Sequence, residues 1–250
     1  MTYRNGYKCV FFDSEEHRLV VIRELTMHVS ETAGHVAALL LRPEHARWLL
    51  VLAHGAGAGM RHTFMERLAH ELAASEVATF RYQFPYMEQH RGRPDPPAVL
   101  RATVRAAIAA AAEVAPDLPL LAGGKSLGGR MSSHVLSEPP PTGLADATRR
   151  VRGLIFFGFP LHPPGRPGTQ RAAHLERVEV PMLFLQGTRD TLADLALLRP
   201  LCVKLAPRAT LHIVDTADHS FHVLKRSGTT DAHVLRHLAR TAVVWADALG

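Results

Sequence analysis

A serine stands between two glycines in the segment Gly-Lys-Ser-Leu-Gly at residues 124–128. This is the G-x-S-x-G pattern of a nucleophile elbow, a sharp strand-to-helix turn that presents a serine hydroxyl at the edge of a sheet. Residues 118–122 form a short apolar run typical of a buried strand, and a helical pattern follows through Met131 towards Ser137. This context favours Ser126 as a nucleophile over the alternative of an ordinary glycine-rich turn.

A phosphate-binding loop is the competing interpretation of Gly-Lys-Ser at 124–126. That loop has the pattern G-x-x-x-x-G-K-S, which needs a glycine at position 119. This chain has Pro119 there, so the sequence excludes a Walker-type loop.

A serine nucleophile needs a base, and the base needs an acid that orients it. After a nucleophile elbow, the expected chain order is Ser, then Asp or Glu, then His. Asp190 follows the apolar segment 181–186, and His219 follows the segment 210–214. Parallel strands present their carboxyl ends at one edge of a sheet, so both side chains should lie near Ser126. The order and spacing predict that these three residues act together.

Other residues compete for the acid and base roles. Asp194 and Asp215 are alternatives for the acid, whereas Asp218 is adjacent to His219 and poorly placed to hold its ring from the side. Six other histidines follow the serine with poorer placement: His162, His174, His212, His222, His233 and His237. No third ligand with zinc-site spacing accompanies His219 and His222, so we expect no metal site.

Acyl transfer also needs backbone N–H donors for the oxyanion of its tetrahedral intermediate. One donor is expected from Leu127, the residue after the nucleophile, and one from the loop after an early strand. The segment His54-Gly55-Ala56-Gly57 is that loop, with Ala56 as the first candidate donor and Gly57 as the second. The alternative is a flexible glycine turn. We expect His54 to brace the loop without transferring a proton.

Short apolar segments alternate with helical patterns from Gly34 onward. The predicted strands are 37–42, 48–53, 77–82, 118–122, 153–159, 181–186 and 210–214. The predicted helices are 63–75, 99–114, 192–204 and 231–248, together with the one that follows Gly129 and runs through Met131 towards Ser137. The Pro-rich stretch 85–97 is predicted to be a loop. This alternation predicts an α/β fold with a mostly parallel sheet and helices on both faces. We assign residues 34–250 to this domain and residues 1–33 to an N-terminal extension, which adds antiparallel edge strands or lies across the surface.

The composition narrows the class of protein. With 250 residues, 47% hydrophobic and 21% charged, the chain is long and apolar enough for a globular domain. No apolar run approaches the roughly 20 residues that cross a bilayer, and the N-terminus lacks a signal-peptide pattern. The net charge is +6, but the basic residues are scattered along the chain, which argues against nucleic-acid binding. Cys9 and Cys202 are far apart, so we expect no disulfide framework and a cytoplasmic location.

Several segments together resemble one branch of the α/β-hydrolase superfamily. They are HGAGAGMRH (54–62), RYQFPYME (81–88), RPDPP (93–97), LAGGKSLGGRMSS (121–133), FGFPLHPPG (157–165), PMLFLQGTRD (181–190) and ADHSFHV (217–223). The branch is a dienelactone-hydrolase-like group that includes bacterial predicted hydrolases, the testis-expressed type and the hydrolase-like domain of a histone acetyltransferase complex subunit. The resemblance implies an α/β-hydrolase fold with a triad of Ser126, Asp190 and His219. Dienelactone hydrolases use a cysteine nucleophile, whereas this chain has serine, so dienelactone chemistry itself does not carry over.

We therefore expect a serine hydrolase that cleaves small acyl esters, thioesters or lactones through an acyl-enzyme on Ser126, without a cofactor. Only about twenty residues separate the predicted strands 153–159 and 181–186, too few for a large cap domain, so the site should be open. The candidates for the substrate pocket are Tyr82, Phe84, Tyr86 and Met87, with packed core as the alternative for two of them. The alternative function is a non-catalytic protein-interaction module on the same fold. The residues leave open the natural substrate, the oligomeric state and the role of Lys125 beside the nucleophile.

Overall fold

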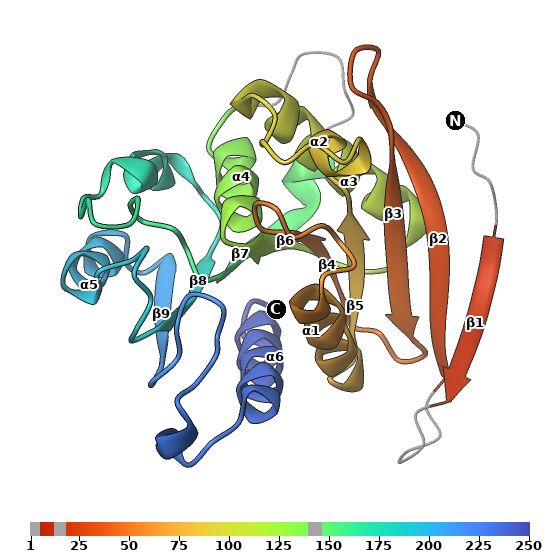
Figure 1. The fold of residues 1–250 in the computed structure, drawn as a ribbon. Coiled ribbons are helices and arrows are strands. Elements are labelled where there is room, and N and C mark those ends of the chain that lie inside the picture. The colour runs from red at the N-terminus through yellow and green to blue at the C-terminus, as the bar shows by residue number, and fades with distance from the viewer. Residues whose placement is uncertain (1–5, 13–18, 140–146) are drawn as a thin grey trace.

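The computed structural model describes residues 6–12, 19–139 and 147–250. Within these residues, nine strands form one sheet in the order β1-β2-β3-β5-β4-β6-β7-β8-β9 (Figure 1). The strands are β1 (Gly6–Phe12), β2 (Leu19–Ser30), β3 (Gly34–Pro43), β4 (Trp48–Ala53), β5 (Val77–Tyr82), β6 (Leu120–Lys125), β7 (Val151–Phe157), β8 (Met182–Gly187) and β9 (Ala209–Val214). From β5 to β9 neighbouring strands are parallel, whereas β1, β2 and β3 are antiparallel to their neighbours. The predicted α/β architecture with a mostly parallel sheet is confirmed.

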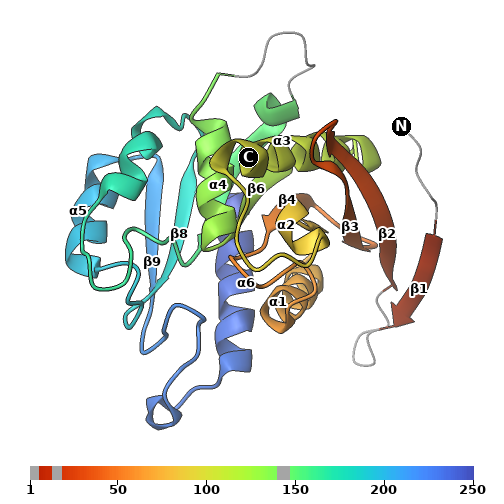
Figure 2. The same ribbon diagram turned by 45° about the horizontal axis from the view of Figure 1, so that its top comes forward.

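Helices cover both faces of this sheet, which explains why the central strands β4, β5, β6 and β8 are buried along their whole length and mostly apolar. The α-helices are α1 (Thr63–Ala74), α2 (Pro85–Glu88), α3 (Pro97–Val114), α4 (Leu127–Leu136), α5 (Leu195–Lys204) and α6 (Asp231–Asp247), and the 3-10 helices are η1 (Ala147–Arg150), η2 (Gln170–Arg177) and η3 (Lys225–Ser227). Along β4, Leu49 and Val51 belong to the core cluster that includes α3 and α4. Leu50 and Leu52 point the other way, into the cluster with α1 and α6, which lie side by side (Figure 2).

Polar side chains fix where three of these helices begin. His62 Nδ1 accepts the N–H of Phe64 at 3.2 Å at the start of α1. Asp194 and Thr230 cap α5 and α6 in the same way, through N–H groups two and three residues further on. Such caps satisfy N–H groups that have no acceptor within the helix.

The strand ends near Ser126 differ from prediction by a few residues. β6 ends at Lys125 rather than at residue 122, because its pairing with β4 and β7 continues through Gly124 to Lys125. β7 ends at Phe157 rather than at residue 159, because Gly158 turns the chain with a φ of +74°. Helix α4 begins at Leu127, directly after the serine. The predicted loop 85–97 contains the single turn of α2.

The N-terminal residues that the structure describes extend the sheet beyond β3. β2 pairs with β3 from Val20 to Ser30, and β1 forms the outer edge. The rest of the extension, residues 1–5 and 13–18, lies outside the described residues. Among the helices that are described, none combines the length and apolarity needed to span a bilayer.

Candidate active site

Ser126 occupies a strained turn of one residue between β6 and α4. Its φ and ψ are +49° and −114°, a conformation that costs a non-glycine residue about 1–3 kcal/mol. The turn packs tightly on the end of β4, because a Cβ atom placed on Gly128 would lie 2.5 Å from the Ala53 carbonyl oxygen. A Cβ on Gly124 would lie 2.2 Å from the same oxygen. The two glycines of the motif are therefore required by close backbone contact.

The structure brings the three predicted triad residues into one line of hydrogen bonds. Ser126 Oγ lies 2.9 Å from His219 Nε2, and His219 Nδ1 lies 2.7 Å from Asp190 Oδ2. The carboxylate side chain has 0% of its surface exposed and the imidazole 23%. An ionised carboxylate can only accept a hydrogen bond, so Nδ1 carries the proton and Nε2 is free to accept the serine proton. This is the geometry of a nucleophile, its base and an orienting acid.

Asp190 is held by two further donors. Gln186 Nε2 donates to its Oδ2 at 2.5 Å, and the Leu192 N–H donates to its Oδ1 at 2.8 Å. Gln186 is fully buried near the end of β8, and its Oε1 accepts the Phe159 N–H at 2.9 Å. The motifs of the sequence do not predict this role for Gln186. The signal was present, because it is the one polar residue in the apolar run Pro-Met-Leu-Phe-Leu-Gln at 181–186.

The three competing acids and five of the six competing histidines have other partners. Asp194 caps α5, Asp215 accepts the Thr216 N–H, and Asp218 accepts the N–H groups of Ser220 and His222. The remaining histidine contacts are His162 with Asp194, His174 with Ser133, His212 with His237, and His222 with Asp231. Within the described residues, no group of three or more His, Cys, Asp or Glu is arranged to hold a metal ion.

His54 braces the loop after β4 in its uncharged form. Its Nδ1 donates to the Gly55 carbonyl oxygen at 2.7 Å, while its Nε2 accepts the Phe84 N–H at 3.1 Å. The ring has no exposed surface, and this burial lowers the pKa of His54 to about 4. The expectation that His54 supports the loop agrees with these contacts.

The three candidate oxyanion donors differ in their surroundings. The Gly57 N–H already donates to the Tyr86 hydroxyl at 3.2 Å. Gly57, the second candidate for the loop donor, is therefore withdrawn. Ala56 lines the cavity next to Ser126. Leu127 is the first residue of α4, where an N–H has no acceptor within its own helix. Ala56 and Leu127 therefore remain the candidates.

A cavity of about 670 Å³ lies beside Ser126 and His219. Its apolar wall comes from α1, from the segment after His219 and from α6, through Phe64, Met65, Phe221 and Leu235. Its charged or titratable lining residues include Arg67, Lys125 and Asp231. The cavity is thus formed on the α1 and α6 face of the sheet.

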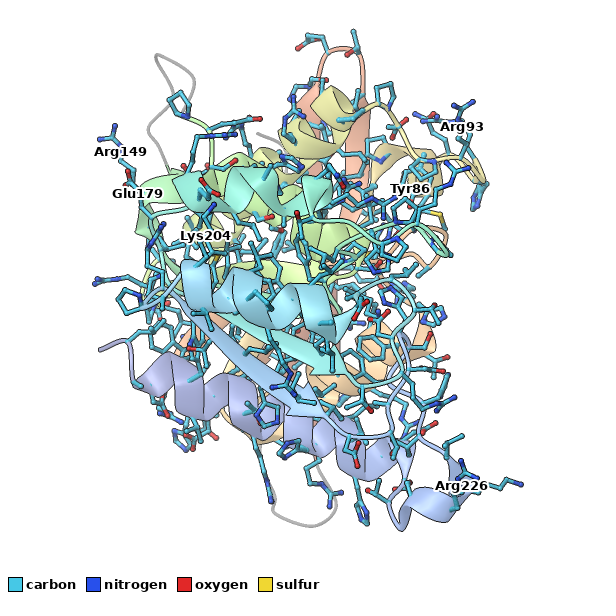
Figure 3. The ribbon with its side chains drawn as sticks, turned by 90° about the vertical axis from the view of Figure 1, so that its left-hand side faces the viewer. Tyr86, Arg93, Arg149, Glu179, Lys204 and Arg226 are labelled. Carbon is cyan, nitrogen blue, oxygen red and sulfur yellow. The ribbon has the colours of Figure 1, made fainter. Side chains whose placement is uncertain are left out.

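The predicted substrate pocket of Tyr82, Phe84, Tyr86 and Met87 is wrong, because none of them lines this cavity. The first three have no exposed surface, and all four pack with the core cluster on the opposite face of the sheet. The hydroxyl of Tyr86, which is labelled in Figure 3, accepts the N–H of Gly57. Phe64 and Met65 could have been found from the sequence, because a helix that follows the loop after β4 must begin at the same edge of the sheet.

The chain matches one protein family and is similar in fold to several solved structures. The model of the alpha/beta hydrolase domain family matches residues 46–247. An alpha-beta serine hydrolase homologue from Coxiella burnetii superposes with a TM-score of 0.67 and 18% identity over 86% of this chain and 96% of that one. A dienelactone hydrolase from Anabaena variabilis superposes with a TM-score of 0.63 and 17% identity, over 98% of this chain and 97% of that one. A serine hydrolase without a lid from Xanthomonas campestris superposes with a TM-score of 0.62 and 20% identity, over 88% of this chain and 94% of that one.

Proposed function

Because the chain belongs to the alpha/beta hydrolase family, we propose that it is a serine hydrolase acting on small acyl esters, thioesters or lactones. The observation that carries the proposal is the hydrogen-bonded line from Ser126 through His219 to Asp190 at a strained elbow. A protein that only binds partners has no need for a strained serine aligned with a base and a buried acid. The geometry therefore favours catalysis over a non-catalytic interaction module.

The reaction would proceed in two halves. His219 Nε2 takes the proton of Ser126 as its Oγ attacks the acyl carbonyl carbon, and a tetrahedral oxyanion forms. The bond to the leaving oxygen or sulfur then breaks, and His219 returns the proton to that atom. Water, deprotonated by the same nitrogen, attacks the acyl carbon. The bond from that carbon to Ser126 Oγ then breaks, His219 returns the proton to Oγ, and the carboxylic acid leaves.

The other residues would stabilise charge during these steps. Asp190 holds the imidazole in the required tautomer, and Gln186 and Leu192 hold Asp190. The N–H groups of Leu127 and Ala56 would bind the oxyanion, a contribution of about 3 kcal/mol for one donor in comparable enzymes.

The proposed substrate class follows from the space around the nucleophile. The cavity has a largely apolar wall and a volume of about 670 Å³, which suits a short acyl chain. The connection from β7 to β8 contains only the 3-10 helix η2 among its helices, so no helical cap arises from it. The proposal is therefore for small soluble substrates rather than long lipids under a lid.

Turnover of short acyl esters and thioesters tests this proposal. We expect hydrolysis by the wild type and a loss of several orders of magnitude in kcat for Ser126→Ala, His219→Ala and Asp190→Asn. The matched control is Ser75→Ala at the far end of α1, which should retain wild-type rates. Turnover by Ser126→Ala at the wild-type rate would contradict the proposal.

A further inference from the structure

Lys125, the residue before the nucleophile, buries an amine that lacks a hydrogen bond. The residue is 9% exposed, and within the described chain no partner lies within hydrogen-bond distance of Nζ. The nitrogen lies 5.9 Å and 5.6 Å from the ring centroids of Phe64 and Phe221. Burying an ammonium away from water is costly unless another charge offsets it, so the position calls for an explanation.

The amine faces the acid side of the triad. A Cβ atom placed on Gly158 would lie 3.1 Å from Lys125 Nζ and 3.4 Å from His219 Nδ1. Nδ1 is the nitrogen that bonds Asp190, so the Lys125 side chain approaches the His219–Asp190 hydrogen bond. Burial lowers the pKa of Lys125 to about 8, against the opposing effect of the charges on Asp190 and Asp218. Below that pH the amine is mainly cationic.

Among the described residues, no lysine or arginine forms an ion pair with Asp190. Its described hydrogen-bond partners are His219, Gln186 and the Leu192 N–H, and its side chain has 0% exposed surface. Gln186 and the Leu192 N–H carry no positive charge, and a neutral imidazole at His219 would add none. A buried carboxylate is stable only when its charge is balanced nearby.

We propose that Lys125 is a positioning residue for the triad, whose ammonium balances the buried charge of Asp190 and keeps His219 neutral. The inference rests on the proposed hydrolase function. A fixed cation beside an imidazole disfavours its protonated form, so His219 stays available as a base at a lower pH. Without Lys125, only a protonated His219 would balance the charge of Asp190. His219 would then take up its proton at a higher pH, and a protonated imidazole cannot accept the serine proton.

The other charged and titratable groups around His219 are more exposed to solvent. They are Asp218 and His222 on its own segment, His62 before α1, Arg67 on α1, and Asp231 at the start of α6. His222 and Asp231 are hydrogen-bonded to each other at 2.7 Å with side chains 68% and 40% exposed. Solvent and salt screen such groups more strongly than they screen the buried Lys125.

The pH dependence of the labelling rate with a fluorophosphonate tests this role for Lys125. We expect the acid limb of the Lys125→Met profile to move up by about one pH unit, with a roughly tenfold slower rate below it and recovery at higher pH. Lys125→Arg, which retains the charge, should keep the wild-type midpoint. Lys204→Met is the matched control, because Lys204 lies on α5 with its side chain 66% exposed (Figure 3).

Other outcomes separate this role from a purely structural one. A rate lowered by one factor at all pH values, or an unshifted midpoint, would overturn the proposal. The same titration followed by NMR through the His219 Nδ1 proton needs no activity, so it tests Lys125 even if Ser126 takes no label. Thermal unfolding checks the fold of each variant, and Lys125→Gln replaces Lys125→Met if the latter does not fold. A labelled wild type with an unshifted variant would refute this role alone, whereas an unlabelled wild type would refute the hydrolase function.

Discussion

Gln186 and Asp190 are joined by a 2.5 Å hydrogen bond between two fully buried side chains at the end of β8. Through its other atom, Gln186 accepts the N–H of Phe159 beyond β7. One amide thus connects Asp190 to the chain that leaves the neighbouring strand. The position of Asp190 is therefore determined by the sheet as well as by its own loop.

Replacing Gln186 by Met should weaken both stability and activity. The change leaves the buried Phe159 N–H unpaired, which costs about 1–3 kcal/mol of unfolding free energy. Asp190 also loses one of its donors, and we expect kcat/KM to fall by about 10- to 100-fold. Urea unfolding and ester hydrolysis measure the two effects. Gln170→Met at the exposed first residue of η2 is the control, and equal behaviour of the two variants would count against this connection.

Gly158→Ala should impair the site through crowding as well as backbone strain. Its φ is +74°, and the added Cβ would meet Lys125 Nζ and His219 Nδ1. Gly165 has a similar φ of +67°, but no described atom lies within 4 Å of its Cβ position. Both variants should lose about 1 kcal/mol or more from strain, and only Gly158→Ala should also lose most of its labelling rate. Thermal unfolding and fluorophosphonate labelling together distinguish these effects, and equal labelling of the two variants would exclude crowding at Gly158.

The two buried tyrosines offer a matched pair of hydroxyl deletions. Tyr86→Phe removes the acceptor of the Gly57 N–H and should cost about 1 kcal/mol of stability and slow turnover. The Tyr82 hydroxyl is buried, and no partner for it exists in the described part of the chain. Tyr82→Phe should therefore be neutral or stabilising. The reverse order of the two unfolding midpoints would contradict the assigned contacts.

Buried histidines should make the protein less stable in mild acid. Burial lowers the pKa of His54 to about 4 and that of His174 to about 3, both below the ordinary 6.5. The unfolded chain therefore binds more protons than the folded one below pH 6.5, and stability falls as the pH falls through this range. Each group should contribute about 1.4 kcal/mol per pH unit between 6.5 and its folded pKa. Urea unfolding at several pH values measures the slope, and His174→Gln should reduce it; an unchanged slope would contradict the assignment.

The fold and the meeting of Ser126, Asp190 and His219 could be predicted because strand ends determine both. Apolar runs locate the parallel strands, and parallel strands bring the residues after them to one edge. The pocket could not be predicted in this way. Tyr82 ends a strand that is buried on both faces, and such a strand does not reveal which face borders the cavity. The partner of the Gly57 N–H also depends on a turn 29 residues away, which no local pattern encodes.

Intact-mass analysis after exposure to a fluorophosphonate tests the central claim most directly. The probe reports an activated serine without knowledge of the substrate. We predict one adduct on the wild type and none on Ser126→Ala, with both proteins shown to be folded. Absence of an adduct on folded wild type, or an equal adduct on the variant, would contradict the assignment of Ser126 as the nucleophile.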